Sequence, residues 1–159
     1  MKKQVLIADT DEQFRKELVT ALEDSVEFEV MGVATDGEEA LQIARVNRPD
    51  IIVLDLLLPR YDGIGVLDLI SVLYTDCKVF VATGFISNYI VSALAARRVS
   101  AFLKKPCTAQ CIVDRINETL KRGDIPIEKN FRRFIRKLRR PMGQKCHIGC
   151  CNMMSNMIH

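Results

Sequence analysis

Short apolar runs alternate with helix-period segments five times along the chain. The apolar runs predict strands at residues 4–8, 28–34, 51–54, 78–82 and 99–103. The segments after them carry apolar residues every three or four positions: Phe14, Leu18, Ala21 and Leu22; Ala40, Leu41 and Ala44; Leu67, Ile70 and Tyr74; Ile86, Ile90 and Leu94; Ile112, Ile116 and Leu120. This alternation predicts repeated strand–helix units and a parallel sheet with helices on both faces.

The strand sequences also predict an order in the sheet. Four of them are apolar throughout, as central parallel strands are, whereas Glu29 interrupts the 28–34 strand as expected at an edge. With right-handed crossovers, the fold class is α/β: a flavodoxin-like, doubly wound five-stranded parallel sheet of order 2-1-3-4-5. Open sheets of this kind bind ligands beyond the carboxyl ends of their strands, at the point between the first and third strands where the order reverses.

Isolated polar residues stand at the ends of four predicted strands. Asp9, Asp55, Thr83 and Lys105 each follow an apolar run directly or within two residues. Because carboxyl ends of parallel strands meet at one edge, a carboxylate pair, a hydroxyl and an ammonium are expected to lie there together. A carboxylate that is helped by neighbouring positive charge suits phosphoryl transfer.

These residues and their surroundings resemble the receiver domain of two-component response regulators, over about residues 3–121. The resemblance rests on segments 5–9, 49–55, 58–63, 83–84 and 102–106. Segments 29–41 and 62–68 are most similar to receivers of DNA-binding regulators, including the sporulation master regulator of Firmicutes. The resemblance implies a cytoplasmic response regulator that controls transcription and catalyses only its own phosphorylation and dephosphorylation.

The resemblance also assigns roles to individual residues. Asp55 would accept a phosphoryl group from a sensor histidine kinase, a phosphotransfer protein or a small acyl phosphate. Mg²⁺ would be held by Asp9, Asp55 and the backbone carbonyl of Leu57. Lys105 would pair with a phosphoryl oxygen, and the Thr83 hydroxyl would move to bond another.

The sequence departs from the family pattern at Thr10. Receivers usually carry two adjacent acids after the first strand, the second of which binds the metal directly, and here the pair reads Asp9-Thr10. A neutral hydroxyl should weaken Mg²⁺ binding unless Asp11 substitutes, or Thr10 could cap the helix that begins at Asp11. An alternative function is therefore a protein-binding receiver that works without phosphorylation.

In the family, the fourth and fifth strands and helices pass the signal on. An aromatic residue on the fifth strand turns inward when this happens. Phe102 occupies that switch position, and the Lys105-Pro106 bond is expected to be cis, as in the family. The fourth helix carries Tyr89 and Val91 beside its core stripe. They form either part of a homodimer face or part of the core.

The charge of +3 divides unevenly along the chain. Residues 1–120 hold 13 basic and 18 acidic side chains, and residues 121–159 hold 10 and 2. We predict a receiver domain at 1–122, followed at 123–159 by a linker, a basic amphipathic helix near 128–140 and a cysteine-containing tail. The basic helix could bind DNA or an anionic membrane surface, pack on the receiver, or lead into an effector.

The six cysteines show no disulfide framework, and no signal-peptide pattern precedes them, which predicts a reducing cytoplasm. Four residues that are close together in the sequence could bind zinc: Cys146, His147, Cys150 and Cys151. Structural zinc sites, however, normally pair ligands from two separated segments. An exposed, oxidation-prone end fits better.

Two other classes are disfavoured by the sequence. Residues 79–96 lack charge, but Thr83-Gly84 divides them into a strand and a helix, so they do not predict a membrane span. A haloacid-dehalogenase-like phosphohydrolase could use Asp9 and Asp11 as nucleophile and acid. That family, however, needs Thr or Val where Gln13 stands, and a late acidic pair that is missing near Lys105.

Overall fold

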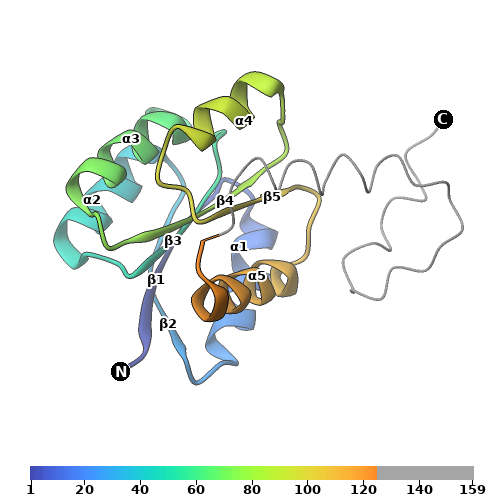
Figure 1. Ribbon diagram of the computed structural model, residues 1–159. Coiled ribbons are helices and arrows are strands. Elements are labelled where there is room, and N and C mark those ends of the chain that lie inside the picture. The colour runs from blue at the N-terminus through green and yellow to red at the C-terminus, as the bar shows by residue number, and fades with distance from the viewer. Residues whose placement is uncertain (125–159) are drawn as a thin grey trace, which may run out of the picture.

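A computed structural model describes residues 1–124, which form one parallel five-stranded sheet of order β2-β1-β3-β4-β5 (Figure 1). The strands are β1 Lys3–Ala8, β2 Phe28–Ala34, β3 Ile51–Leu54, β4 Lys78–Thr83 and β5 Ala101–Lys104. The helices are α1 Glu12–Glu23, α2 Gly37–Asn47, α3 Gly63–Leu73, α4 Asn88–Ala95 and α5 Ala109–Arg122. The flavodoxin-like order predicted from the sequence is confirmed. The predicted helix at 128–140 and the terminal cysteines lie outside the described residues.

Helices cover both faces of the sheet, which explains the uninterrupted apolar strands. Figure 1 shows α1 and α5 on one face and α2, α3 and α4 on the other. On the first face, side chains such as Phe14, Leu18 and Ile112 pack against β1, β3 and β4. On the second, Leu67 and Leu94 close a core over the opposite side of the same strands. β2 is an edge strand as predicted, with Glu29 exposed.

Each of the helices α1 to α5 begins at a polar cap whose side chain accepts a hydrogen bond from a backbone N–H in the first turn. The five caps are Asp11, Asp36, Asp62, Ser87 and Thr108. Such caps satisfy donors that have no partner within the helix. The cap of α1 is Asp11, so the alternative in which Thr10 caps this helix is wrong.

A few sequence predictions are wrong at the margins of elements. Val99 lies in the turn after α4, where its N–H donates to the Arg97 carbonyl, so β5 begins at Ala101. Ile86 precedes α4, and Leu120 is exposed on α5 rather than part of the core. The 79–96 stretch is divided as expected into β4 and α4, and none of the helices within residues 1–124 is long and apolar enough to cross a membrane.

Candidate functional site

Asp9 and Asp55 lie side by side because their strands are neighbours in register. Ala8 of β1 pairs with Leu54 of β3, and the Asp55 N–H donates to the Ala8 carbonyl at 2.8 Å. The two carboxylates follow these paired residues and emerge at the same edge. Both residues are buried, at 1% and 5% exposure. The sheet thus concentrates negative charge where its order reverses.

Lys105 joins the two carboxylates. Its Nζ donates to Asp9 Oδ2 at 2.5 Å and to Asp55 Oδ2 at 3.1 Å. The ammonium also lies 4.6 Å from the ring centroid of Phe14, within cation–π range. The expected cis peptide between Lys105 and Pro106 is present, and the Lys105 N–H donates to the Thr83 carbonyl at 2.9 Å.

The other carboxylate oxygen of Asp9 and of Asp55 accepts a hydrogen bond from a backbone N–H group. Asp9 Oδ1 accepts from Asp11 at 2.9 Å, and Asp55 Oδ1 accepts from Leu57 at 3.0 Å. These bonds fix both side chains at the ends of their strands. Each carboxylate is therefore held on one oxygen by the loop and on the other by Lys105.

Two acids and one ammonium leave the cluster short of positive charge. Burial raises the pKa of the Asp9 carboxyl, and the hydrogen bond from Lys105 only partly offsets this effect. Burial by itself would lower the pKa of the Lys105 ammonium. The hydrogen bond and charge of Asp9, together with Asp55, outweigh burial and raise it. The site thus holds a firmly charged lysine and an unneutralised acid that favours a further cation.

Thr83 reaches the same edge on β4, between β3 and β5. It is fully buried, and its Oγ1 accepts the Phe85 N–H at 3.3 Å. The hydroxyl thus accepts its hydrogen bond from its own loop, while Lys105 contacts both Asp9 and Asp55 directly. A rotation of the Thr83 side chain about χ1 would let the hydroxyl bond a different partner.

Phe102, on β5 opposite Val81, is turned inward. It is 4% exposed and belongs to the core formed with α3 and α4. In α4, Val91 is buried in this core, whereas Tyr89 is 78% exposed. Of the two residues considered for a dimer face, only Tyr89 is available at the surface.

Three further residues shape the site without having been predicted from the sequence. Phe14 supports Lys105, and the Arg15 guanidinium donates to the Asp9 carbonyl at 2.7 Å. Gly63 is required by close approach, since a Cβ there would collide with the Asp55 carbonyl and lie 2.5 Å from the Leu56 Cα. The Asp62-Gly63 pair was the available signal, because it marks a helix start packed against a backbone.

The donor set for a divalent cation is small. Within residues 1–124 no group of three acidic, histidine or cysteine side chains could enclose a metal. Thr10 is exposed and neutral, and the Asp11 carboxylate caps α1 through the Phe14 N–H at 3.0 Å. Asp9 and Asp55 still fit Mg²⁺, which keeps several waters and commonly binds through one or two carboxylates and a phosphate.

Comparison with known proteins identifies the family and the fold. The profile of the response regulator receiver domain matches residues 5–117. The chain belongs to this family. The transcriptional regulatory protein LiaR of Bacillus subtilis is 33% identical over 117 residues, 74% of this chain and 56% of LiaR. PdtaR of Mycobacterium tuberculosis, also a transcriptional regulatory protein, is 28% identical over 120 residues, 76% of this chain and 58% of PdtaR.

Solved receivers have the same fold. The receiver domain of a NarL regulator from Mycobacterium tuberculosis superposes with a TM-score of 0.69 at 28% identity, covering 76% of this chain and 98% of that one. The CheX–CheY–BeF₃–Mg²⁺ complex from Borrelia burgdorferi gives 0.67 at 26% identity, over 74% and 89%. This receiver chain spans little more than half the length of the LiaR and PdtaR relatives.

Proposed function

We propose that this receiver accepts a phosphoryl group on Asp55 and thereby controls an output surface that regulates transcription. The observation that supports it best is the contact of the Lys105 ammonium with both Asp55 and Asp9 at the carboxyl edge of the sheet. A carboxylate can attack a phosphorylated donor only where the added negative charge is matched. Here a half-buried cation already bridges the nucleophile and a second acid.

In the transfer step, an Asp55 oxygen attacks phosphorus in a phosphohistidine. The P–N bond breaks, a P–O bond forms, and the imidazole nitrogen leaves and takes up a proton. A sensor histidine kinase or phosphotransfer protein, in the predicted cytoplasm, is the proposed donor. Lys105 keeps its contact with Asp9 and pairs with a phosphoryl oxygen, so that its charge follows the group being transferred.

Mg²⁺, when bound by Asp9, Asp55 and the Leu57 carbonyl, would supply charge neutralisation at the phosphoryl oxygens. The Borrelia CheY relative was solved with BeF₃ and Mg²⁺, which supports the assignment by likeness. Lys105 already bonds one Asp9 oxygen, and burial raises the pKa of this carboxyl, so a second cation bound here would stabilise its ionised form.

The signal would leave through Thr83 and Phe102. Thr83 Oγ1 would exchange the Phe85 N–H for a phosphoryl oxygen and draw the loop before α4 inward. The buried Phe102 would be held in its inward position by that movement. The surface of α4, β5 and α5 would then favour a second copy or a partner protein, as a shift between two populated states.

The test is the intact mass of the chain after incubation with acetyl phosphate and Mg²⁺. We expect a single phosphoryl adduct in the wild type, its loss in Asp55→Asn, and its retention in Asp50→Asn, a partly exposed acid before the same strand. An adduct that persists in Asp55→Asn, or no adduct and no response to beryllofluoride in the wild type, would overturn the proposal.

A second candidate is a receiver that binds its partner without phosphorylation. It is supported by Thr10, which leaves two carboxylates for the metal while Asp11 caps α1. Partner binding that is identical in wild type and Asp55→Asn would favour it. Thr10→Asp provides the complementary measurement, because a third carboxylate should raise the adduct yield at limiting Mg²⁺ if metal binding limits phosphorylation.

A further inference from the structure

Helix α3 has two apolar faces, and only one of them is used by the core. Val66, Leu67 and Ile70 are buried. On the opposite side, Leu69, Val72 and Leu73 are 38%, 75% and 61% exposed. These three residues have the i, i+3, i+4 spacing of a continuous stripe, and we call them the α3 apolar face. A surface helix normally turns charged residues to solvent, but α3 carries a single charge, at Asp68.

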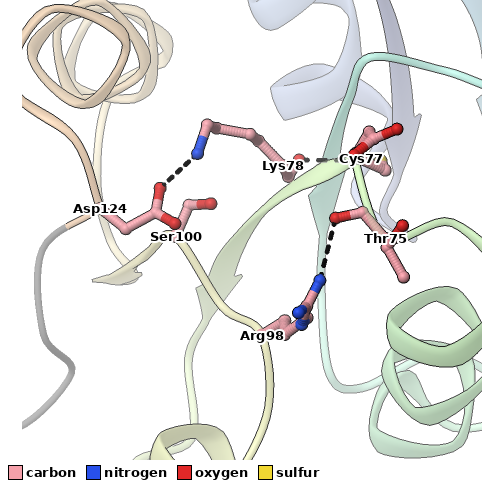
Figure 2. Close-up of a pocket in the computed structure, with 7 residues that line it drawn as sticks. Thr75, Cys77, Lys78, Arg98, Ser100 and Asp124 are labelled. Atoms are coloured by element: carbon pink, nitrogen blue, oxygen red, sulfur yellow. Dashed lines mark hydrogen bonds and ion pairs between the residues drawn. The ribbon is translucent and has the colours of Figure 1, made fainter.

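The described chain ends beside the carboxyl end of this helix. After α5, Gly123 adopts a φ of +87°, which glycine tolerates, and Asp124 forms an ion pair with Lys78 at 2.7 Å. Asp124 and Lys78 line a hollow of about 380 Å³. The other residues that line it are Thr75, Asp76, Cys77, Arg98 and Ser100 (Figure 2). Thr75 stands two residues after Leu73, so the described chain ends across this hollow from the carboxyl end of α3.

The sequence that follows matches this face in spacing and chemistry. Residues 125–140 contain seven basic side chains and one acidic side chain. Their apolar residues recur at intervals of three and four positions, at Phe131, Phe134, Ile135 and Leu138. Three residues separate Asp124 from position 128 and can span about 14 Å when extended, so a docked segment could begin up to that distance from Asp124.

Charge distinguishes the α3 apolar face from the apolar residues around α4. Residues 1–77, which form β2, β1 and β3 with their helices, hold 16 acidic and 7 basic side chains. Residues 78–124, which form β4 and β5 with theirs, hold 3 acidic and 8 basic side chains. Phe85 and Tyr89 are also exposed, but they lie in the basic half, which repels a cationic segment.

The carboxyl-terminal half of α3 and the turn after it already bind two cations of the fold, the first of which is Arg97, paired with Asp68 at 2.6 Å. The last turn of α3 contains no basic residue to offset the partial negative charge of the helix terminus. Just beyond it, the Thr75 carbonyl already accepts a hydrogen bond from Arg98 Nη1 at 3.2 Å (Figure 2). Further guanidinium groups would find carbonyl oxygens and the exposed Asp76 carboxylate in the same place.

We propose that residues 128–140 dock on the α3 apolar face of the same molecule. Phe131, Phe134, Ile135 and Leu138 would cover Leu69, Val72 and Leu73, and the arginines would lie over the acidic half of the receiver. This contact is independent of phosphoryl transfer at Asp55. While docked on α3, the basic segment would be less available to bind an anionic partner.

The test is hydrogen exchange of residues 128–140 in the full chain, followed by mass spectrometry. Val72→Asp should speed exchange about tenfold, because burial of one such side chain corresponds to a tenfold shift in a docking equilibrium. The matched control is Tyr89→Asp, which places the same charge on an equally exposed residue of α4 and should leave exchange unchanged. Arg136→Glu with Lys137→Glu, which alters the segment alone, should also speed exchange.

Three results would overturn the proposal. Rapid exchange in the wild type that none of these variants alters would mean that the segment does not dock. Acceleration by Tyr89→Asp in place of Val72→Asp would put the segment on α4. Protection that rises with protein concentration would identify a second copy as the occupant. Equal thermal midpoints for Val72→Asp and Tyr89→Asp establish that both variants fold.

Discussion

Two lysines form ion pairs at opposite ends of the same sheet. Lys105, at the carboxyl edge, has a side chain that is 18% exposed and contacts carboxylates that are 2% and 8% exposed. Lys78, at the amino edge, is 36% exposed and contacts Asp124, which is 53% exposed. The chemical groups are identical, and their distances to oxygen lie within the same range. Burial and the number of partners distinguish them.

The difference separates the proposed phosphorylation site from a structural contact. At the carboxyl edge two acids share one ammonium, which leaves one negative charge that the proposed metal ion would balance. At the amino edge one ammonium meets one acid, and the pair only fixes where the chain leaves α5. Water screens that exposed pair, whereas the buried cluster keeps most of its electrostatic energy.

The largest effect is expected from crowding the carboxyl edge at Gly63. Gly63→Ala would place a methyl group against the backbone of Asp55 and Leu56, which cannot move without disturbing β3. We expect a loss of about 3 kcal/mol in the free energy of unfolding, measured with urea. Gly84→Ala is the control, because a Cβ there meets nothing within 4 Å. Equal stability of the two variants would contradict the close packing described for Asp55.

Removing the buried cation should come next. Lys105→Met keeps most of the unbranched side chain but leaves Asp9 and Asp55 facing each other without an ammonium. We expect a cost of about 1–2 kcal/mol at pH 7, below the full value for a buried pair because Lys105 is partly exposed. The cost should shrink at pH 5, where a proton can replace the lysine. Urea unfolding at both pH values measures it, and a cost that grows on acidification would refute this explanation.

A smaller effect is expected from the titration of Asp9. Its pKa in the fold lies above the ordinary value of 3.8, so the stability gained from its protonation is complete below 3.8 and is lost as the pH rises through the raised value. Relative to Asp9→Asn, the wild type should gain about 1 kcal/mol or less between pH 7 and pH 4. Thermal or urea unfolding of both proteins gives this difference. A difference that is constant, or of opposite sign, would contradict the raised pKa.

The smallest effect belongs to the amino edge. Lys78→Met should cost less than about 0.5 kcal/mol, because both partners are solvated and the pair gains little over hydration. The cost should fall further in high salt. Urea unfolding at two salt concentrations measures it. A loss that equals that of Lys105→Met would remove the distinction between the two ends of the sheet.

Much of the site could be predicted because strand periodicity is local. Asp9 and Asp55 follow apolar runs, and the parallel order alone brings them together. The pairing of Lys78 with Asp124 joins residues 46 positions apart and depends on where α5 ends, which no local pattern records. Phe14 was expected only in the apolar stripe of its helix, and no sequence pattern marked Arg15, since the contacts of both with the site depend on how α1 packs beside the end of β1.

The sequence predictions that are wrong, or that left two alternatives open, lie mostly near the ends of elements. Thr10 and Asp11 are both good caps, and only the backbone selects Asp11. Val99 is apolar and buried like a strand residue, but it lies in the turn before β5. Tyr89 and Val91 could not be separated by periodicity at the start of a helix of eight residues. In each case tertiary packing decided between alternatives of similar local preference.

The division of the sheet into an acidic and a basic half has a consequence for the approach of other molecules. Within residues 1–124 this division gives an electric dipole directed across the strands, from β2 toward β5, whenever the basic segment 128–140 is not docked on the acidic half. Near a polyanion the dipole experiences a torque before any contact forms, and the half that contains α4, β5 and α5 turns toward it. An acidic partner would therefore meet the proposed output surface first, and the rate of productive encounter would exceed that of random collision.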